Sequence, residues 1–494
     1  MGPSQVYRTS LALLTDFYQL TMAYAAWKGG VAGKEAVFHL SFRRNPFEGG
    51  YAVAAGLADA VDLALHAQFT AEDLAFLGAQ AGSDGKPLFE PAFLDWLSAF
   101  RPEVDVDAVP EGTVVFPHEP LLRVRGPIVP CMLLETPLLA VVNFQTLVAT
   151  KAARIVLAAR GAPVVEFGLR RAQGIDGALS AARAAWIGGV AGTSNVLAGR
   201  LHGIPVKGTH AHSWVMLFDD ELEAFETYAD ALPGNTVLLV DTYDTLDGVR
   251  HAIEVGKRLA SRGHRLAGIR LDSGDLAWLS QQARSLLDEA GLGSTAILAS
   301  NELDEHVIQA LQDQKAAIGI WGVGTRLVTA WDEPALGGVY KLSAVRDGPD
   351  HPWDYRVKLS EQLAKTTIPG ILQVRRYHHR DGFLADVIHD VDLGLPEGPE
   401  MVDPLDHTRR RVIDPGTPGE DLLVPVLRGG RPVWEAPPLA EVRARAAAQL
   451  ARVHAGVKRL VHPHSYPVGL ERSLYDLRTR LILTAREAAT RRTR

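Results

Sequence analysis

The chain has almost no cysteine and no long uncharged apolar run. Its 494 residues include one cysteine, Cys131, so neither an intrachain disulfide nor a cage of several thiolates around zinc can form. This composition is typical of a reducing cytoplasm, where we expect the protein to reside. The first eight residues lack the apolar core of a signal peptide. No uncharged apolar stretch reaches the roughly 18 residues of a membrane span, so we expect no membrane partner.

An excess of positive charge is also missing. Lys and Arg total 51 against 58 Asp and Glu, which gives a formal net charge of −7. Nucleic-acid-binding proteins need a basic face, so we expect no nucleic-acid partner. A local anion site is still compatible with this balance. At about 150 residues per domain, the length indicates roughly three domains or one large core with additions.

Between residues 160 and 345, β-like and helical segments alternate. The short apolar runs lie at 163–167, 204–207, 236–240, 267–271, 295–299 and 316–321. Alternation of this kind predicts parallel strands with helical crossovers, and continuously apolar strands indicate burial on both faces. The pattern favours a (β/α) barrel over an open doubly wound sheet, because polar side chains follow all six runs and barrel active sites lie at the carboxyl ends of strands.

The flanking regions have a different pattern. Residues 10–28 predict a helix and 35–43 an antiparallel strand, so 1–150 is expected to form a separate α+β domain. After the barrel at 151–345, short strands separated by loops rich in Pro, Gly and Asp are followed by Ala/Arg/Leu-rich helices. We expect this third region, 346–494, to pack on the other two.

His210 and His212 follow the run at 204–207. On a strand, two residues at this spacing point to the same side. Such a pair can hold a metal in a barrel hydrolase, with Asp241 and Asp272 at later strand ends as companions. A strand-end histidine can also be a general base, a nucleophile toward phosphorus, or a structural hydrogen-bonding group. No further strand-end histidine completes a metal set, and we assign no residue as a metal ligand.

Two arginine sites lie within or after other apolar runs. Arg270 lies inside the apolar run 267–271, where an unpaired charge is costly, so it needs either a carboxylate such as Asp272 or an anionic ligand. Arg170 and Arg171 follow the run 163–167. They can clamp a phosphate or carboxylate, or pair with nearby acids.

Two loops have alternative interpretations. Gly322-Val323-Gly324-Thr325 fits a phosphate cradle that leads into a helix, or an ordinary tight turn. Asp272-Ser273-Gly274-Asp275 fits either site residues or a helix N-cap. Tyr18 lies in the helix predicted at 10–28, where an aromatic side chain is usually part of the core.

At these residues the sequence resembles the nicotinate phosphoribosyltransferase family. The resemblance covers residues 10–60 and 160–345, in the family's order. It is carried by the segments Leu13 to Met22, Glu166 to Gly174, Thr193 to Asn195, Gly208 to Ser213, Leu239 to Tyr243, Arg270 to Leu276, Ser300-Asn301 and Gly322 to Thr325.

The resemblance implies an α/β chain with an irregular (β/α) barrel of the type II phosphoribosyltransferase kind, an α+β N-terminal domain and a smaller C-terminal region. It implies a ligase-type reaction. Nicotinate, phosphoribosyl pyrophosphate, ATP and water give nicotinate mononucleotide, pyrophosphate, ADP and phosphate. This is the first step of NAD salvage from nicotinate. The cofactor implied is Mg²⁺, ATP is a co-substrate, and the partner is a second copy in a homodimer with shared active sites.

The resemblance also implies roles for single residues. His212 becomes the phosphohistidine, with Asp241 and Asp272 as the other catalytic residues. Nicotinate binds to three residues, of which the first reaches in from the other subunit: Tyr18, Thr209 and Arg270. Phosphoribosyl pyrophosphate binds to Arg170, Asn301, Gly322, Gly324 and Thr325.

Two positions depart from the family pattern. His210 stands where a smaller or apolar residue is commoner, and as a second basic group it is expected to perturb the pKa of His212. Glu302 stands where a second asparagine is common. Three alternatives stay open at this point: a transferase acting on nicotinamide, the His-x-His metal hydrolase, and a non-catalytic nicotinate-binding or scaffold protein.

Overall fold

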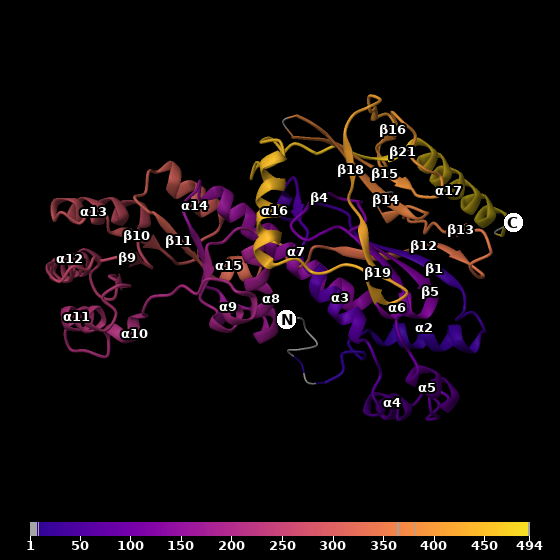
Figure 1. Ribbon diagram of the computed structural model, residues 1–494, viewed down its shortest axis with the longest axis horizontal. Coiled ribbons are helices and arrows are strands. Elements are labelled where there is room, and N and C mark those ends of the chain that lie inside the picture. The colour runs from indigo at the N-terminus through magenta and orange to yellow at the C-terminus, as the bar shows by residue number, and fades with distance from the viewer. Residues whose placement is uncertain (1–6, 8, 363–364, 381, 493–494) are drawn as a thin grey trace. The chain divides into compact units, whose positions relative to one another are not determined.

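The computed structural model describes residues 7, 9–362, 365–380 and 382–492. Apart from Tyr7, the N-terminal octapeptide considered above lies outside these residues, as do Thr493 and Arg494. The chain divides into two compact units (Figure 1). Residues Val148–Pro334 form one, here called the parallel unit, and residues Met1–Leu147 with Ala335–Arg494 form the other, here called the two-sheet unit.

The parallel unit is built on a six-stranded sheet in which every pairing is parallel. In spatial order its strands are β7 (Gly192–Thr193), β6 (Val164–Glu166), β11 (Ile320–Val323), β10 (Ala296–Ala299), β9 (Gly268–Leu271) and β8 (Val237–Leu239). A single bridge from Thr193 to Val206 extends the β7 edge. Within the described residues no ladder joins Val206 to β8, so one side of this irregular barrel is open.

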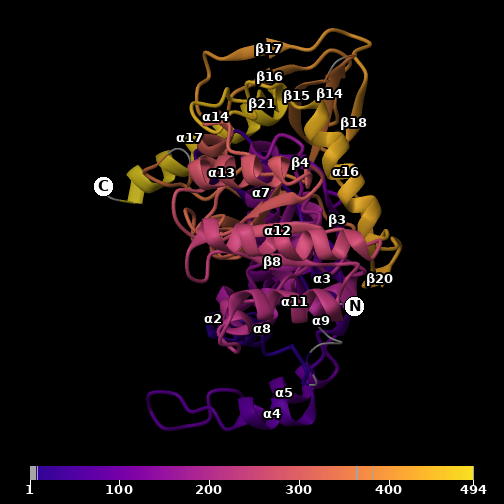
Figure 2. The ribbon, with the colours of Figure 1, turned by 90° about the vertical axis from the view of Figure 1, so that its left-hand side faces the viewer.

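Helices follow the strands. They are α8 (Gly174–Ile187), α9 (Val196–His202), α10 (His212–Val215), α11 (Glu221–Ala231), α12 (Thr245–Ser261), α13 (Leu276–Glu289), α14 (Glu305–Asp313) and α15 (Thr325–Val328). Asp244, Asp275 and Asp304 each accept hydrogen bonds from backbone N–H groups in the first turn of α12, α13 and α14. Figure 2 shows α11, α12 and α13 stacked side by side in front of the sheet.

Four of the six predicted strands are confirmed, and two predictions need correction. The run 204–207 makes only the bridge at Val206, because Pro205 has no N–H to add to a ladder. The last strand is β11, which begins at Ile320 and includes Gly322, so the prediction at 316–321 lay too early.

The two-sheet unit combines strands from both ends of the chain. Its antiparallel seven-stranded sheet has the order β13 (Asp354–Tyr355), β12 (Gly338–Arg346), β1 (Glu35–Phe42), β5 (Leu122–Pro127), β3 (Asp105–Ala108), β19 (Val424–Arg428) and β20 (Arg431–Pro432). Glu35 lies opposite Arg346 in the register of β1 and β12. The N- and C-terminal parts therefore share one sheet.

A second, mixed sheet of this unit has the order β17 (Arg410–Val412), β16 (Glu400–Val402), β21 (Val468–Glu471), β15 (Gly382–Asp390), β14 (Leu372–His379) and β18 (Gly419–Asp421). A small ladder joins β2 (Ala52–Val53) to β4 (Val114–Val115). The helices are α2 (Phe17–Lys28), α3 (Leu57–His66), α4 (Ala71–Gly78), α5 (Pro91–Ser98), α6 (Ile128–Leu133), α16 (Leu439–Arg452) and α17 (Arg472–Arg492). Helix α7 (Glu135–Ala158) contains the boundary between the two units.

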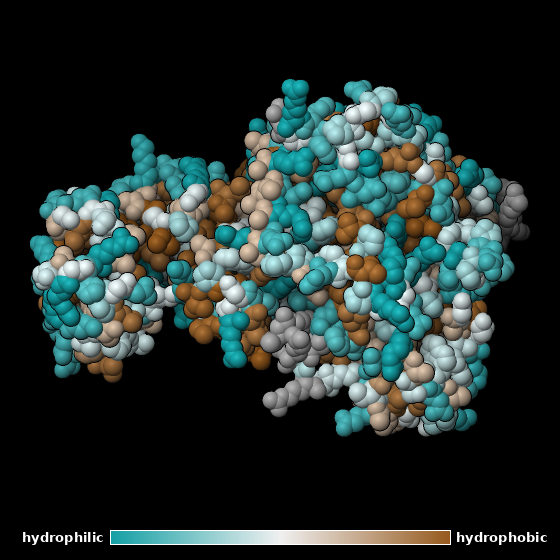
Figure 3. Space-filling model, viewed as in Figure 1, coloured by the Kyte–Doolittle hydropathy of each residue, from teal (hydrophilic) through white to brown (hydrophobic). Residues whose placement is uncertain are grey.

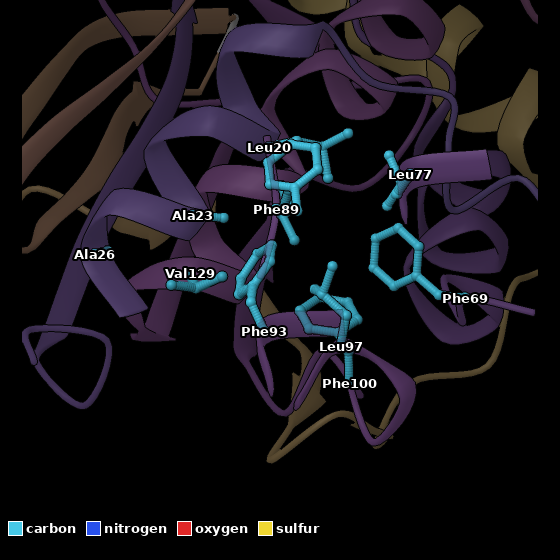
Figure 4. Packing of buried hydrophobic residues seen from close by; sticks show 11 residues of the cluster. Leu20, Ala23, Ala26, Phe69, Leu77, Phe89, Phe93, Leu97, Phe100 and Val129 are labelled. Atoms are coloured by element: carbon cyan, nitrogen blue, oxygen red, sulfur yellow. The ribbon is translucent and has the colours of Figure 1, made fainter. Parts of the chain in front are cut away.

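Helix α2 begins at Phe17, later than predicted, because Asp16 has an extended backbone and forms the N-cap position. One face of α2 packs into a hydrophobic cluster with α4 and α5 (Figure 4). Leu20 and Ala23 are buried there, whereas the residue Tyr18 is 48% exposed. The prediction that an aromatic at this position is part of the core is therefore wrong for Tyr18.

The segment Ile128–Ala158 is long and apolar enough to cross a membrane, judged by length and composition alone. More than half of its most apolar stretch, 56%, is buried inside the protein. Core helices of globular proteins have the same property.

Candidate active site

Three neighbouring strands of the parallel unit are connected through side chains at their carboxyl ends. The Oδ2 atom of Asp241, after β8, accepts hydrogen bonds of 2.7 Å from the Asp272 N–H and the Ser273 hydroxyl, both after β9. The Asp272 carboxylate accepts a hydrogen bond from the Ser300 hydroxyl, after β10. The other oxygen of Asp241 is buried without a hydrogen-bond partner in the described part of the chain. The two aspartates thus place negative charge at one edge of the sheet.

His212 lies beside these carboxylates. It is the first residue of α10, and its side chain is 40% exposed. Nδ1 is 3.2 Å from the Thr242 hydroxyl, and Nε2 is 3.7 Å from Asp272 Oδ2. An imidazole with one nitrogen held by a hydroxyl and the other facing an acidic, open site can exchange a proton or a phosphoryl group.

His210 does not share this environment. Residues 208–211 form no strand, and the two imidazoles differ in burial, so the expectation that they point to the same side is wrong. Nε2 of His210 accepts a 3.1 Å hydrogen bond from the Leu239 N–H, and Nδ1 faces the Ala211 carbonyl at 3.3 Å. Burial, opposed by that carbonyl, lowers the pKa of His210 to about 4. Its lone pair is used within the fold, which excludes a His-x-His metal pair and a second basic group.

Arg270 joins β9 to the loop before His212. Its Nη1 donates a 2.8 Å hydrogen bond to the Thr209 hydroxyl, and its Nε is buried with no partner in the described chain. Burial lowers the pKa of the guanidinium, and the charges of Asp272 and Asp241 oppose that effect. Asp272 forms no ion pair with Arg270. Of the two partners predicted for this arginine, a protein carboxylate and an anionic ligand, the structure therefore leaves room for the ligand.

The arginines after β6 are exposed on a short 3₁₀ turn, Leu169–Arg171. Among the described residues, neither Arg170 nor Arg171 has a salt bridge or side-chain hydrogen bond, and Arg170 is close enough to Arg270 to affect its pKa. The preceding Glu166 is buried and accepts hydrogen bonds from the Gly168 N–H and the Thr193 hydroxyl. Glu166 therefore holds the chain next to the 3₁₀ turn through these two hydrogen bonds. Burial raises the pKa of its carboxyl group.

The glycine loop follows β11. A Cβ on Gly322 would lie 2.7 Å from the Phe167 ring, and one on Gly324 would lie 3.3 Å from the Phe167 carbonyl oxygen. Packing against Phe167 thus requires a small residue at 322, while Gly324 leads into α15, which begins at Thr325. The Thr325 hydroxyl is 3.4 Å from Glu302, and the neighbouring Asn301 has a φ of 120°. Such backbone strain is common at functional sites.

Asp275, not Asp272, caps helix α13. The N-cap interpretation of Asp272-Ser273-Gly274-Asp275 therefore holds for Asp275, whereas the site role of Asp272 stays a prediction. Tyr18 belongs to the two-sheet unit, where partial burial and the nearby carboxylate of Glu135 raise the pKa of its hydroxyl. The other predicted site residues gather in the parallel unit.

Comparison with known proteins identifies the family. Three family models cover most of the chain: the nicotinate phosphoribosyltransferase N-terminal domain over residues 13–143, the nicotinate phosphoribosyltransferase family over 163–347, and the corresponding C-terminal domain over 373–478. The chain belongs to the nicotinate phosphoribosyltransferase family. Its C-terminal third, where few family residues were recognised in the sequence, is included in the match.

Relatives from this family match over nearly the full length. The nicotinate phosphoribosyltransferase of Bacillus subtilis is 40% identical, with 94% of each chain covered. That of Mycobacterium tuberculosis is 43% identical over 93% of this chain and 97% of the relative. The crystal structure of human nicotinic acid phosphoribosyltransferase superposes with a TM-score of 0.82 at 34% identity, covering 94% of this chain and 99% of that one. The predicted fold class, an irregular (β/α) barrel of the type II kind with N- and C-terminal regions, is confirmed.

Several contributors to this family member's site were not predicted. Thr242 and Ser300 hold His212 and Asp272, and Glu166 holds the turn that presents Arg170. Thr242 and Ser300 lie in segments that carry the resemblance, but hydroxyls are too common near strand ends to stand out. Glu166 lies in another of these segments, to which the resemblance assigns no role for it.

A second basic site lies within the two-sheet unit. A cavity of about 590 Å³ there is lined in part by Arg43, His118, Tyr466 and the run 409–411, Arg409-Arg410-Arg411. Arginine side chains of this kind suit a phosphate or carboxylate. The sequence pattern did not indicate this cavity, because Arg43 follows β1 whereas the other arginines lie at the start of β17, far away in the chain.

Proposed function

We propose that the chain is an ATP-coupled nicotinate phosphoribosyltransferase that makes nicotinate mononucleotide and pyrophosphate, the first step of NAD salvage from nicotinate. Family membership supports the transferase reaction. The observation that supports this reaction at this site is the hydrogen bond between Arg270 and Thr209, which lies beside His212 and Asp272. A cation with an unpartnered donor suits the carboxylate of nicotinate better than the neutral amide of nicotinamide.

In this proposal, nicotinate binds with its carboxylate toward Arg270 and Thr209. The exposed ring of Tyr18, contributed by the second subunit of a dimer, stacks on the pyridine. Phosphoribosyl pyrophosphate binds to Arg170, Asn301 and the loop of Gly322, Gly324 and Thr325. The N–H groups at the start of α15 would bind the 5-phosphate, and the guanidinium of Arg170, which has no salt bridge among the described residues, would supply positive charge.

The transfer breaks the bond between ribose C1 and the pyrophosphate oxygen and forms a bond from C1 to the pyridine nitrogen. Positive charge develops on the sugar as the leaving group departs. Asp241 and Asp272 lie at the strand edge where their negative charge would stabilise that state. Because Asp241 is held by two hydrogen bonds, its carboxylate is oriented before the substrate binds.

Magnesium fits this acidic edge. Mg²⁺ is usually bound by one or two carboxylates together with water and substrate phosphates. The buried Asp241 oxygen, which has no partner among the described residues, and the Asp272 carboxylate would be such ligands. The ion would neutralise the departing pyrophosphate. Among the described residues no group of three or more His, Cys, Asp or Glu could hold a metal by itself, as suits an ion that is shared with the substrate.

ATP is proposed to phosphorylate His212. When Nδ1 donates its proton to Thr242, the Nε2 lone pair can attack the γ-phosphorus, so that an N–P bond forms and ADP leaves. The phosphoryl group adds about −1.5 to −2 charges next to Asp272. That repulsion can reorganise the carboxylate edge and couple ATP use to binding of the sugar phosphate. Water later hydrolyses the phosphohistidine and releases phosphate.

A homodimer in the cytoplasm is the proposed working form. The surface over the packed helices α8 and α9 is largely apolar (Figure 3), with Ile175 86% and Val196 67% exposed. Apolar surface of this extent marks interaction sites in many proteins. Sedimentation of wild type and Val196→Glu checks this interface, and a monomeric wild type would contradict it.

The decisive experiment mixes the protein with nicotinate, phosphoribosyl pyrophosphate and Mg²⁺, with and without ATP, and measures mononucleotide, ADP and phosphate. We expect turnover that ATP stimulates, with ADP formed alongside product. A parallel reaction with nicotinamide should be far slower. Equal use of nicotinamide would support the alternative transferase, and no turnover under any of these conditions would support a non-catalytic binding protein.

A further inference from the structure

On the open side of the parallel barrel, the imidazole of His210 bonds to the unpaired edge of strand β8. The two edges of the sheet are the segment at Val206, attached to β7, and strand β8. These edges are consecutive in the chain, yet no backbone ladder joins them within the described residues. Leu239 of β8 is fully buried, and its N–H donates to Nε2 of His210. Without that acceptor, a buried edge N–H would lose its partner.

The hydrogen bonds determine the form of this imidazole. A backbone N–H can only donate, so Nε2 must carry the lone pair, and the proton resides on Nδ1, facing the Ala211 carbonyl. The ring is 8% exposed and packs edge-on against Tyr228 of α11, with centroids 4.8 Å apart. His210 is thus a neutral ring held on two sides.

The residues on either side of His210 carry the proposed chemistry. Thr209 accepts the hydrogen bond from Arg270 and donates to the His210 carbonyl. His212, two residues later, is held by Thr242 beyond β8. The segment 209–212 therefore touches β9, β8 and the loop after β8 in turn, and its central attachment is the imidazole of His210.

We propose that His210 is a positioning residue that closes the open side of the barrel and so holds Thr209 and His212 in register with β8 and β9. This inference rests on the proposed function. His210 touches neither substrate nor reacting atoms; it acts through its two neighbours. A smaller or apolar residue at this position would leave the Leu239 N–H to another acceptor.

The test compares His210→Phe, which keeps a ring but removes the acceptor, with His210→Gln, whose amide oxygen restores it. For His210→Phe we expect the KM for nicotinate to rise about tenfold and the ATP-stimulated kcat to fall about tenfold, from loss of one buried hydrogen bond. Measured without ATP, the KM for phosphoribosyl pyrophosphate should change by less than about twofold, because the glycine loop lies on other strands. His210→Gln should recover most of the loss.

His251→Gln is the matched control, because His251 bonds Glu221 on the outer helices and should be replaceable without loss of activity. Wild-type parameters for His210→Phe would overturn the inference, as would equal losses in the Phe and Gln variants. A wild type without turnover would instead reject the proposed function. If His210→Phe does not fold, amide hydrogen exchange of wild-type Leu239 decides: slow exchange is expected, and unprotected exchange would overturn the inference.

Discussion

The guanidinium of Arg270 and the hydroxyl of Thr209 are joined by a 2.8 Å hydrogen bond from strand β9 to the loop that leads into His212. One nitrogen of the same guanidinium, Nε, is buried without a partner in the described chain. A buried donor left unpaired costs about 1–3 kcal/mol, and an anionic ligand would remove that cost. This pair thus links the recognition of a carboxylate to the position of the candidate phosphohistidine.

Replacing Arg270 with Lys tests carboxylate recognition. An ammonium cannot present the planar donor pair, so the KM for nicotinate should rise about 10- to 100-fold, equivalent to about 1.4–2.8 kcal/mol. The KM for phosphoribosyl pyrophosphate should stay within about twofold. Steady-state kinetics measure both. Arg284→Lys, a change on the outer helix α13 where Arg284 pairs with Asp288, is the control. An unchanged KM for nicotinate would rule out this role.

Replacing His212 with Ala tests ATP coupling. Product formation should become slow and independent of ATP, because no imidazole remains to accept the phosphoryl group. The readouts are mononucleotide formed with and without ATP, and phosphate retained on the protein after incubation with labelled ATP. Stimulation by ATP equal to that of wild type would reject His212 as the phosphorylated residue.

Gly322→Ala tests the packing beneath the phosphate loop. The added methyl group would meet the Phe167 ring at 2.7 Å, so we expect a loss of about 1–3 kcal/mol in the free energy of unfolding and a higher KM for phosphoribosyl pyrophosphate. Urea titration and kinetics measure these effects. Gly319→Ala is the matched control, because its Cβ would approach the nearest atom, the Ile297 carbonyl oxygen, only to 4.0 Å. Adding Phe167→Leu should restore part of the loss; equal stability of both alanine variants would contradict this packing.

The stability of the wild type should depend on pH through His210. Its pKa falls from 6.5 to about 4 in the folded state, with Arg270 and His212 adding to the effect of burial and the Ala211 carbonyl opposing it. Between these values the unfolded chain binds a proton that the folded chain does not, so stability rises as pH rises from 4 to 6.5. The contribution of His210 to the free energy of unfolding that is lost by pH 4 is about 3 kcal/mol. His118, whose pKa is also lowered to about 4, contributes to every variant alike.

Urea titrations at pH 4.5 and 7 compare wild type with His210→Gln. The Gln variant should have the shallower pH dependence, since it has no imidazole to titrate. Equal slopes would show that His210 does not stay neutral in the folded protein.

Four strands of the parallel unit, β6, β8, β9 and β10, and the residues after them could be predicted from the sequence. Continuous apolar runs identify strands buried on both faces, and parallel strands bring their carboxyl ends to one edge. Asp241, Asp272 and Arg270 follow from this rule alone. The resemblance then supplied the chemistry of His212 and the choice of nicotinate. These features depend on short stretches of chain, which local patterns describe well.

Only the tertiary structure decided which distant segments meet. Glu35 pairs with Arg346 across 311 positions, and no periodicity in either segment identifies the other. The same holds for His210, whose spacing from His212 indicated a shared strand face. Its acceptor nitrogen is instead used by the open edge of β8, because a buried N–H there has no neighbouring strand. Local sequence determines which groups are available, and packing determines which of them are already satisfied before a ligand arrives.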